Sequence, residues 1–216
     1  MTTATDLTVL EICAGAGGQS LGLEQAGFGH EVAVEIDPNA CETLRLNRPT
    51  WTVDEKDVHG FDGKPYKGID LLAGGVPCPP FSIAGKQLGA DDERDLFPQA
   101  MRLVRETKPK AVMLENVRGL STTKFATYRQ SILDELEGMG YRSDWQVINA
   151  CEHGVPQLRP RFILVALQKK YAESFHWPEP VGTPPSVGKA LLPLMKSRGW
   201  EGAEAWAVKA NGIGPT

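Results

Sequence analysis

The chain has 216 residues, 41% of them hydrophobic and 23% charged, which is the ordinary composition of a globular protein and enough for one large α/β domain. Its formal net charge of −4 argues against a generally basic nucleic-acid binder, although it leaves room for a local basic cleft. No apolar run approaches the roughly 20 residues of a membrane helix, and the N-terminus lacks the regions of a signal peptide, so we expect a cytoplasmic protein without a membrane partner.

The 4 cysteines and 4 histidines are scattered along the chain. Neither set shows the CxxC or paired spacing of a metal site, and a disulfide framework is not expected in this setting. We therefore expect no metal, and we interpret Cys13, Cys41 and Cys151 as small core residues.

The first predicted unit is strand, glycine turn and helix. Residues 7–13 form a buried apolar run, residues 14–18 are small and glycine-rich, and residues 19–26 have a helical pattern that ends at a glycine. A second strand, 31–37, ends in acidic residues. Glu35 lies 20 positions after Gly15, close to the spacing at which an acid accepts hydrogen bonds from ribose hydroxyls. The glycine spacing departs from G-x-G-x-x-G, so a dinucleotide and S-adenosylmethionine both stay open.

A proline-rich loop follows the next strands. A helix over 38–47 and a short strand near 51–53 precede Asp57-Val58, where an adenine would be held. The strand 69–73 then leads into Gly74–Ser82. Its three prolines fix the backbone around Cys78, as expected for a displayed nucleophile. The alternative is a proline-rich turn that contains a cysteine by chance.

A long loop, a helix and a fifth strand that ends at a glutamate come next in the sequence. Residues 83–95 lack an apolar period, which is typical of a functional loop or lid, and a helix is predicted over 96–106. Strand 111–114 ends at Glu115. Open α/β sheets bind ligands at the carboxyl ends of their strands, so Glu115 and Cys78 are expected to face one crevice. Alternatively, Glu115 caps the next turn.

The last third carries two arginines and then an irregular tail. A helix is predicted over 122–138 and strands over 145–150 and 161–167. Arg159 and Arg161 are interpreted as guanidinium forks for a phosphate or a base oxygen, or else as an exposed strand entrance. We expect a catalytic, cofactor-binding domain over 1–170. Residues 171–216 form a Pro/Gly-rich extension with only a brief helix near 187–195.

Taken in order, short motifs of this chain resemble those of the cytosine-C5 DNA methyltransferases, chiefly the bacterial restriction-modification type, in their catalytic-domain portion from Leu10 to about Pro180. The resemblance implies a Rossmann-like, S-adenosylmethionine-dependent methyltransferase fold: a mostly parallel twisted sheet with helices on both faces and a final antiparallel strand. The motifs are Glu11–Gly18, Glu35-Ile36-Asp37, Asp57, Pro77–Ser82, Glu115-Asn116-Val117 and Gln157–Arg161.

The resemblance also implies an activity and its residues. A methyl group passes from S-adenosylmethionine to C5 of a flipped-out cytosine in double-stranded DNA through a Cys78–C6 adduct, leaving S-adenosylhomocysteine, with no metal. The implied catalytic residues are Cys78, Glu115, Arg159 and Arg161. The implied cofactor contacts are Cys13, Ala14, Gly15, Gly17, Gly18, Glu35, Ile36, Asp57, Val58, Gly75 and Pro77. The implied DNA-facing residues are Ser82, Lys86, Gln87, Arg94 and Gln157.

The family's target-recognition region and last two motifs have no counterpart before Thr216. We therefore expect a truncated chain, a fragment, or a split enzyme with a second polypeptide, acting at the nucleoid. Three other functions stay open: a tRNA cytosine-C5 methyltransferase, a dinucleotide-dependent oxidoreductase and a non-catalytic DNA-binding subunit.

Overall fold

The computed structural model describes residues 7–77 and 95–211 of the chain. These residues form two compact units: Met1–Gln146 with Phe162–Phe175, and Val147–Arg161 with His176–Thr216. The expected division at residue 170 stays a prediction. Each unit is described here by itself.

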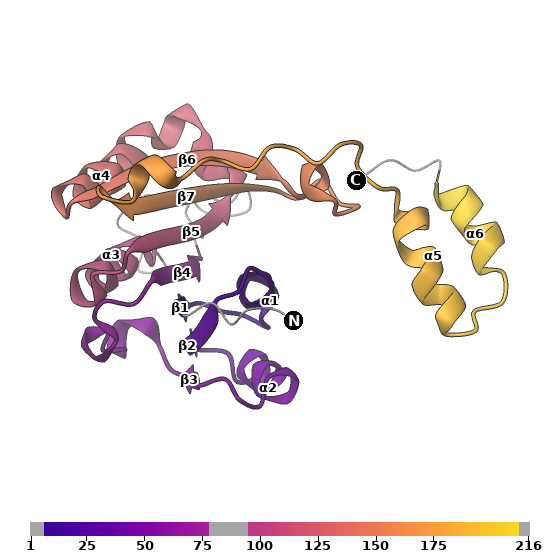
Figure 1. The fold of residues 1–216 in the computed structure, drawn as a ribbon, viewed down its shortest axis with the longest axis horizontal. Coiled ribbons are helices and arrows are strands. Elements are labelled where there is room, and N and C mark those ends of the chain that lie inside the picture. Colours follow the sequence, from indigo (N-terminus) through magenta and orange to yellow (C-terminus); the bar gives the residue numbers. More distant parts are fainter. Residues whose placement is uncertain (1–6, 78–94, 212–216) are drawn as a thin grey trace. The chain divides into compact units, whose positions relative to one another are not determined.

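A seven-stranded sheet with the order β3-β2-β1-β4-β5-β7-β6 is the main feature of the chain. Its first five strands alternate with helices along the sequence, as the apolar runs predict (Figure 1). The strands are β1 (Thr8–Ile12), β2 (Gly29–Glu35), β3 (Val53–Glu55), β4 (Leu71–Gly75), β5 (Ala111–Val117), β6 (Tyr141–Asn149) and β7 (Pro160–Gln168). The helices are α1 (Gly18–Gln25), α2 (Pro38–Asn47), α3 (Phe97–Thr107), α4 (Ala126–Gly138), α5 (Val187–Ser197) and α6 (Ala203–Ala210).

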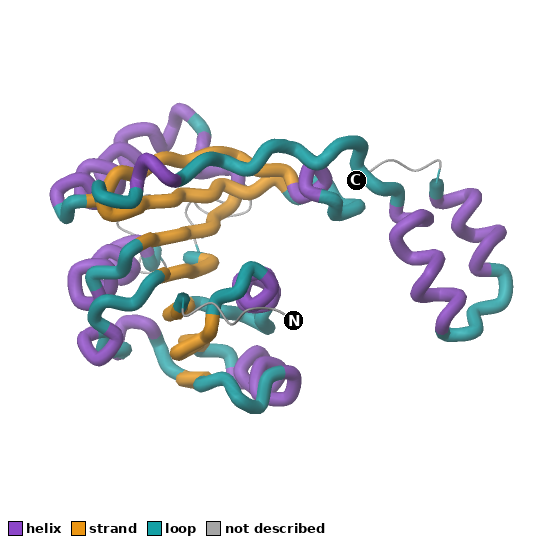
Figure 2. Tube along the Cα trace, viewed as in Figure 1, coloured by secondary structure: helices purple, strands orange, loops and turns teal. Residues whose placement is uncertain are grey.

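Strands β1 to β5 are parallel to one another. The central residues of β1 and β4 are buried because helices cover both faces, which explains why these two strands appear in the sequence as short, largely apolar runs, whereas β3 at the edge of the sheet is only partly buried. The helices α3 and α4 contribute Phe97, Met101 and Leu136 to the core on one face of the sheet. On the opposite face, Leu23 of α1 and Leu44 of α2 pack against β1, β2 and β4 (Figure 2).

The last strand in the sequence, β7, runs opposite to its neighbours β5 and β6 (Figure 1). The N–H of Gln168, at the end of β7, donates to the carbonyl of Lys110, which directly precedes β5. Phe162 of β7 stacks on Trp145 of β6 with ring centroids 5.1 Å apart. The expected mostly parallel sheet with a final antiparallel strand is therefore confirmed.

A buried glutamate–histidine pair lies within this sheet. The side chains of Glu11 on β1 and His30 on β2 are both fully buried, and Glu11 Oε2 lies 3.1 Å from His30 Nε2. The imidazole also stacks on Trp51 at 4.0 Å between ring centroids. A buried carboxylate is costly without a partner, so this contact explains how a strand centre accommodates a glutamate.

The second unit contains the paired helices α5 and α6. Gly188 permits their close approach, because a Cβ there would lie 2.6 Å from the carbonyl oxygen of Ala207. The prediction of an irregular tail with one brief helix was therefore wrong for 203–210. The helix α6 is short and alanine-rich, so it lacks the large apolar residues at helical spacing that mark a helix in sequence.

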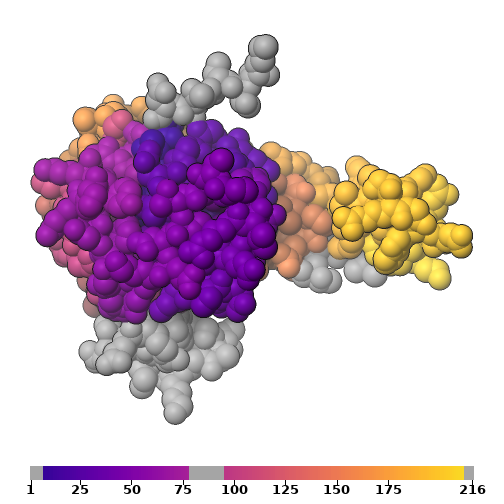
Figure 3. Space-filling view, turned by 90° about the horizontal axis from the view of Figure 1, so that it is seen from below, coloured from indigo at the N-terminus to yellow at the C-terminus, as the bar shows by residue number. Residues whose placement is uncertain are grey.

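In the space-filling view, the N-terminal residues coloured indigo to magenta form one closely packed body, which belongs to the first unit (Figure 3). Across both described ranges, 7–77 and 95–211, no helix is long and apolar enough to span a bilayer.

Candidate active site

The candidate site lies where the parallel strands β1, β2, β4 and β5 end. Pairing between strands aligns Ile12 with both Val34 and Gly74, and it aligns Gly75 with Glu115. The segments that follow these strands therefore emerge along one edge of the sheet. This is the edge at which open α/β sheets bind ligands.

The turn after β1 has an unusual backbone. Cys13, Gly15 and Gly17 have φ angles of 53°, 55° and 91°, in the left-handed region that favours glycine. At Gly17 space is restricted as well, because a Cβ would lie 2.7 Å from Leu44 Cδ2 of α2. The glycines thus allow the chain to turn sharply from β1 into α1 while α2 packs against the turn.

Glu35, at the end of β2, connects this turn to its own strand. Its Oε2 accepts a hydrogen bond from the Gly15 N–H at 2.7 Å, and its Oε1 accepts from the N–H groups of Ile36 at 2.8 Å and Asp37 at 2.9 Å. A carboxylate has roughly four acceptor sites, so these bonds leave about one, on Oε2, for a ligand hydroxyl.

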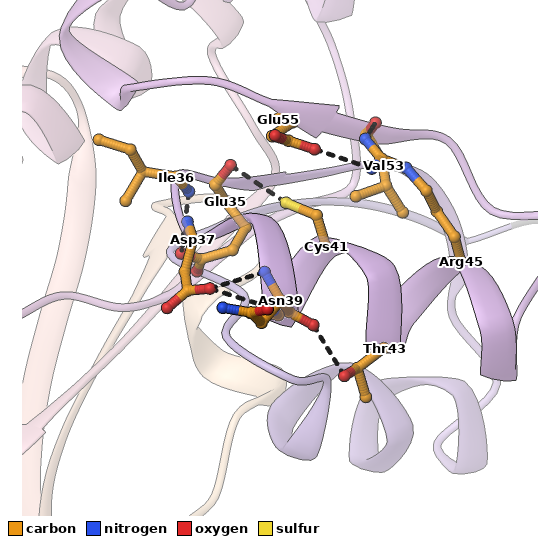
Figure 4. Close-up of polar contacts among 10 residues, drawn as sticks. Glu35, Ile36, Asp37, Asn39, Cys41, Thr43, Arg45, Val53 and Glu55 are labelled. Atoms are coloured by element: carbon orange, nitrogen blue, oxygen red, sulfur yellow. Dashed lines mark hydrogen bonds and ion pairs between the residues drawn. The ribbon is translucent and has the colours of Figure 1, made fainter.

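The next residues anchor the helix that follows. Asp37 caps α2 by accepting from the N–H groups of Asn39 and Ala40, and the Cys41 thiol donates to the Glu35 carbonyl at 3.4 Å (Figure 4). Burial is the main cause that raises the pKa of Cys41. This thiol is therefore a structural group and not a nucleophile.

A cavity of about 500 Å³ opens beside Glu35. This volume lies in the range of nucleotide and cofactor sites. Polar groups from Glu35 and Asp57 lie among mostly apolar walls, which suits a ligand with hydroxyl and amino donors on a flat ring. The described residues that line it are Cys13, Val34, Glu35, Ile36, Lys56, Asp57, Val58, His59, Gly75, Pro77 and Leu96.

The thiol of Cys13 lies in the cavity wall. Burial, followed by the negative charges of Glu35 and Asp57, raises its pKa to about 12. The neutral thiol is therefore a compact apolar surface at physiological pH, consistent with a wall residue.

Asp57 follows β3 and contributes a carboxylate to the cavity wall. Its Oδ1 accepts from the backbone N–H of His59 at 2.9 Å and lies 2.7 Å from the His59 ring Nδ1. These two hydrogen bonds, the backbone one first, lower the pKa of Asp57. The group is therefore ionised and accepts hydrogen bonds throughout the physiological range.

Glu115 lies next to Gly75, which lines this cavity. A Cβ at Gly75 would lie 3.7 Å from Glu115 Oε2 and 3.8 Å from the Cys13 carbonyl. The Val76 N–H donates to the Glu115 carbonyl, and the buried Asn116 amide donates to the Val76 carbonyl at 3.1 Å. The end of β4 is thus fixed beside the cavity and Glu115.

Several expected residues are not brought to this place. Cys78, Ser82, Lys86, Gln87 and Arg94 lie outside the described residues. Three others, Gln157, Arg159 and Arg161, belong to the second unit, where Arg159 has a φ of 27° and Arg161 donates to the Pro160 carbonyl. Their roles stay predictions.

The glycine turn contributes to the cavity indirectly. Ala14, Gly15, Gly17 and Gly18 are not among its described lining, and the Gly15 N–H is bound to Glu35. Conversely, the sequence interpretation missed Val34, Lys56, His59 and Leu96. Only His59 carried a signal, since it follows Asp57 at the spacing of an aspartate-capped turn. In the described ranges, no three histidine, cysteine or carboxylate side chains are grouped as metal ligands.

Comparison with known proteins identifies a matching family. The model of the C-5 cytosine-specific DNA methylase family matches residues 7–206. The Type II methyltransferase M.NgoMIV of Neisseria gonorrhoeae is 59% identical over 210 residues, which cover 97% of this chain and 67% of that protein. The Type II methyltransferase M.NaeI of Lentzea aerocolonigenes is 60% identical over 213 residues, which cover 97% of this chain and 52% of that protein.

A solved structure shows the same fold. A protein described as a DNA modification methyltransferase encoded within an E. coli prophage superimposes with a TM-score of 0.71 and 29% identity, over 86% of this chain and 54% of that one. The expected methyltransferase fold is therefore confirmed. The chain spans between about half and two thirds of the length of these three proteins.

Proposed function

Since the chain belongs to the C-5 cytosine-specific DNA methylase family, we propose that it carries the cofactor and catalytic part of an enzyme that methylates C5 of cytosine in DNA within a restriction-modification system. One observation carries this proposal: Gly75, at the end of β4, lines the cofactor-sized cavity and also lies next to the Glu115 carboxyl. The strand β4 leads, two residues beyond Val76, to Cys78.

S-adenosylmethionine is the proposed cofactor, and when bound it supplies an electrophilic methyl group. Residues of the cavity match its parts in chemistry. Glu35 has an acceptor site for a ribose hydroxyl, Asp57 is an ionised acceptor for an amino group, and the apolar side chains of Ile36 and Val58 suit a purine ring.

Cys78 is the proposed nucleophile. Its thiolate adds to C6 of the cytosine, and the electron pair of the C5–C6 bond then makes C5 nucleophilic. After C5 is methylated, a base removes the C5 proton, the pair re-forms the double bond and the thiolate leaves. Cys78 lies outside the described ranges. The support for this step is therefore the sequence motif around Cys78.

Glu115 is proposed to donate a proton or hydrogen bond at N3 of the cytosine, which stabilises the negative charge that develops on the ring during addition. Arg161, with Arg159, is proposed to contact the base oxygen. The target base must leave the helical stack before these groups reach it, so the substrate is proposed to be bound flipped out.

A labelled methyl-transfer assay tests the proposal on duplex DNA and on tRNA side by side. It is run with this chain alone and with a polypeptide that supplies the part of M.NgoMIV beyond the match. We expect 5-methylcytosine in DNA from the supplemented chain and none from Cys78→Ala, while Cys151→Ala serves as the control. Methylation of tRNA in place of DNA, or activity retained in Cys78→Ala, would contradict it.

A further inference from the structure

His59 is an exposed histidine at the rim of the cavity, and the proposed function gives it no role. His59 lines the cavity, and its ring Nδ1 lies 2.7 Å from Oδ1 of Asp57, with about half of each side chain exposed. An ionised carboxylate has no proton to donate, so the Nδ1 atom carries the hydrogen of this bond. The imidazole therefore acts on Asp57 as a donor, whether it is neutral or charged.

The two hydrogen bonds that Asp57 accepts from His59 converge on the same carboxylate oxygen. Oδ1 accepts from the backbone N–H of His59 and from its ring, and no donor in the described ranges is bound to Oδ2. A carboxylate rotates freely about its terminal torsion when only one weak bond holds it, and two bonds on one oxygen restrict that rotation. The second oxygen is thereby kept available for one external donor.

The turn that carries the pair is fixed from outside the cavity. Arg102 of α3 donates to the carbonyls of Val58 at 2.8 Å and Phe61 at 3.0 Å, and its guanidinium also bonds Glu106 and Gln99. These contacts hold the backbone on both sides of His59. The position of Asp57 and His59 is therefore set before any ligand arrives, which is the condition for selective recognition.

We propose that His59 is a specificity-determining residue: it pins Asp57 so that the remaining carboxylate oxygen selects a ligand purine bearing an exocyclic amino group over one bearing an oxygen there. This inference rests on the proposed adenosyl cofactor and assigns a positioning role to a residue beyond those expected from the sequence. An amino group donates to the carboxylate, whereas a carbonyl oxygen at the same place is repelled by it.

Calorimetric binding of two ligands tests the proposal. S-adenosylhomocysteine carries the amino group, and S-inosylhomocysteine carries an oxygen in its place. The ratio of their dissociation constants measures the selection, and it is compared between the natural chain, His59→Phe and His59→Gln. Phenylalanine keeps a ring without a donor, while glutamine restores a donor.

We expect the ratio to fall about two- to fivefold in His59→Phe, the range for a half-exposed charged hydrogen bond, and to recover in His59→Gln. Thermal unfolding should be unchanged in both variants because the side chain is half exposed. An unchanged ratio in His59→Phe, or an equal loss of affinity for both ligands, would overturn the inference while leaving the proposed function in place. A natural chain that binds neither ligand would overturn the proposed cofactor, and this inference with it.

Discussion

The carboxylate of Glu35 accepts a hydrogen bond from the backbone N–H of Gly15 at 2.7 Å, across 20 residues of sequence. Its other oxygen is bound to two N–H groups of its own strand end. Glu35 therefore shapes the glycine turn in addition to its proposed contact with a ribose. The two roles are compatible because only Oε2 retains an acceptor site.

Replacing Glu35 by glutamine should lower the free energy of unfolding by about 1–3 kcal/mol, since the new NH2 group must face a backbone N–H on one side or the other. The same change should weaken binding of S-adenosylhomocysteine. Urea unfolding of the variant measures the first effect. The exposed Glu31 on the same strand is the matched control, and Glu31→Gln should lie within about 0.5 kcal/mol of the natural chain. Equal losses of unfolding free energy in Glu35→Gln and Glu31→Gln would contradict a stabilising role for the Glu35–Gly15 hydrogen bond.

The thiol of Cys13 should resist alkylation. With its pKa raised to about 12 from an ordinary 9.0, the thiolate fraction at about pH 8 is roughly a thousandfold below that of an unperturbed cysteine. Peptide mass spectrometry after iodoacetamide treatment measures the rate in the folded chain and in denaturant. Similar rates in both conditions would show that the thiol is not held neutral by its surroundings.

Asp70 should contribute stability that depends on pH. It accepts from the N–H and hydroxyl of Thr8 and pairs with Lys110 at 2.5 Å. Burial acts to raise the pKa of Asp70, but the bonds from Lys110 and Thr8 outweigh it and hold the pKa below its ordinary 3.8. A lowered pKa stabilises the fold above the unfolded-state value, and the contribution disappears as the pH falls through the folded-state value.

The Asp70→Asn variant should therefore be less stable than the natural chain by about 1–3 kcal/mol at about pH 7, and the gap should narrow as the pH falls below the ordinary pKa of 3.8. Denaturant unfolding across this range measures it. A gap that is constant with pH would mean that packing, and not charge, accounts for the difference.

Two glycines of the site should differ in their tolerance of a methyl group. At Gly74, a Cβ would lie 2.6 Å from Ile12 Cγ1 and 2.9 Å from the Ile12 carbonyl, where the paired strand cannot move aside. Gly74→Ala should cost about 1–3 kcal/mol of stability. Gly18, at the start of α1, has no atom within 4 Å of its Cβ position, so Gly18→Ala should be neutral or slightly stabilising. Thermal unfolding of the two variants measures the difference. A lower melting temperature for Gly18→Ala than for Gly74→Ala would contradict the β1–β4 packing.

The sequence predicts the central parallel strands β1 and β4 well because both are buried on both faces and so appear as largely apolar runs. It predicts the apolar part of β5, 111–114, whereas pairing with β4 continues to Glu115 and the strand extends to Val117. It also begins the fourth helix at Thr122, whereas a 3-10 turn precedes α4 and the helix begins at Ala126. Polar strand ends and tight turns have no apolar period that would reveal them.

The candidate site shows a similar division. The sequence assigns Glu35 and Asp57 to one cofactor site, and both side chains line the cavity. The sequence does not predict two sets of hydrogen bonds. The Asn116 amide donates to the Val76 carbonyl, and the Arg102 guanidinium donates to carbonyls of the turn after Asp57. Each joins segments about 40 residues apart through side chains whose types are common on surfaces, so no local pattern marks them.

Duplex DNA that contains 5-fluoro-2′-deoxycytidine traps the proposed Cys78–C6 bond, because fluorine cannot leave C5 as a proton does and the enzyme stays bonded to C6. With S-adenosylmethionine present, and with the remaining length of the relatives supplied, we predict a denaturant-stable adduct on the peptide that contains Cys78. It should be absent from Cys78→Ala and present in Cys151→Ala. An adduct on another residue, or methylated cytosine formed by Cys78→Ala, would contradict the account.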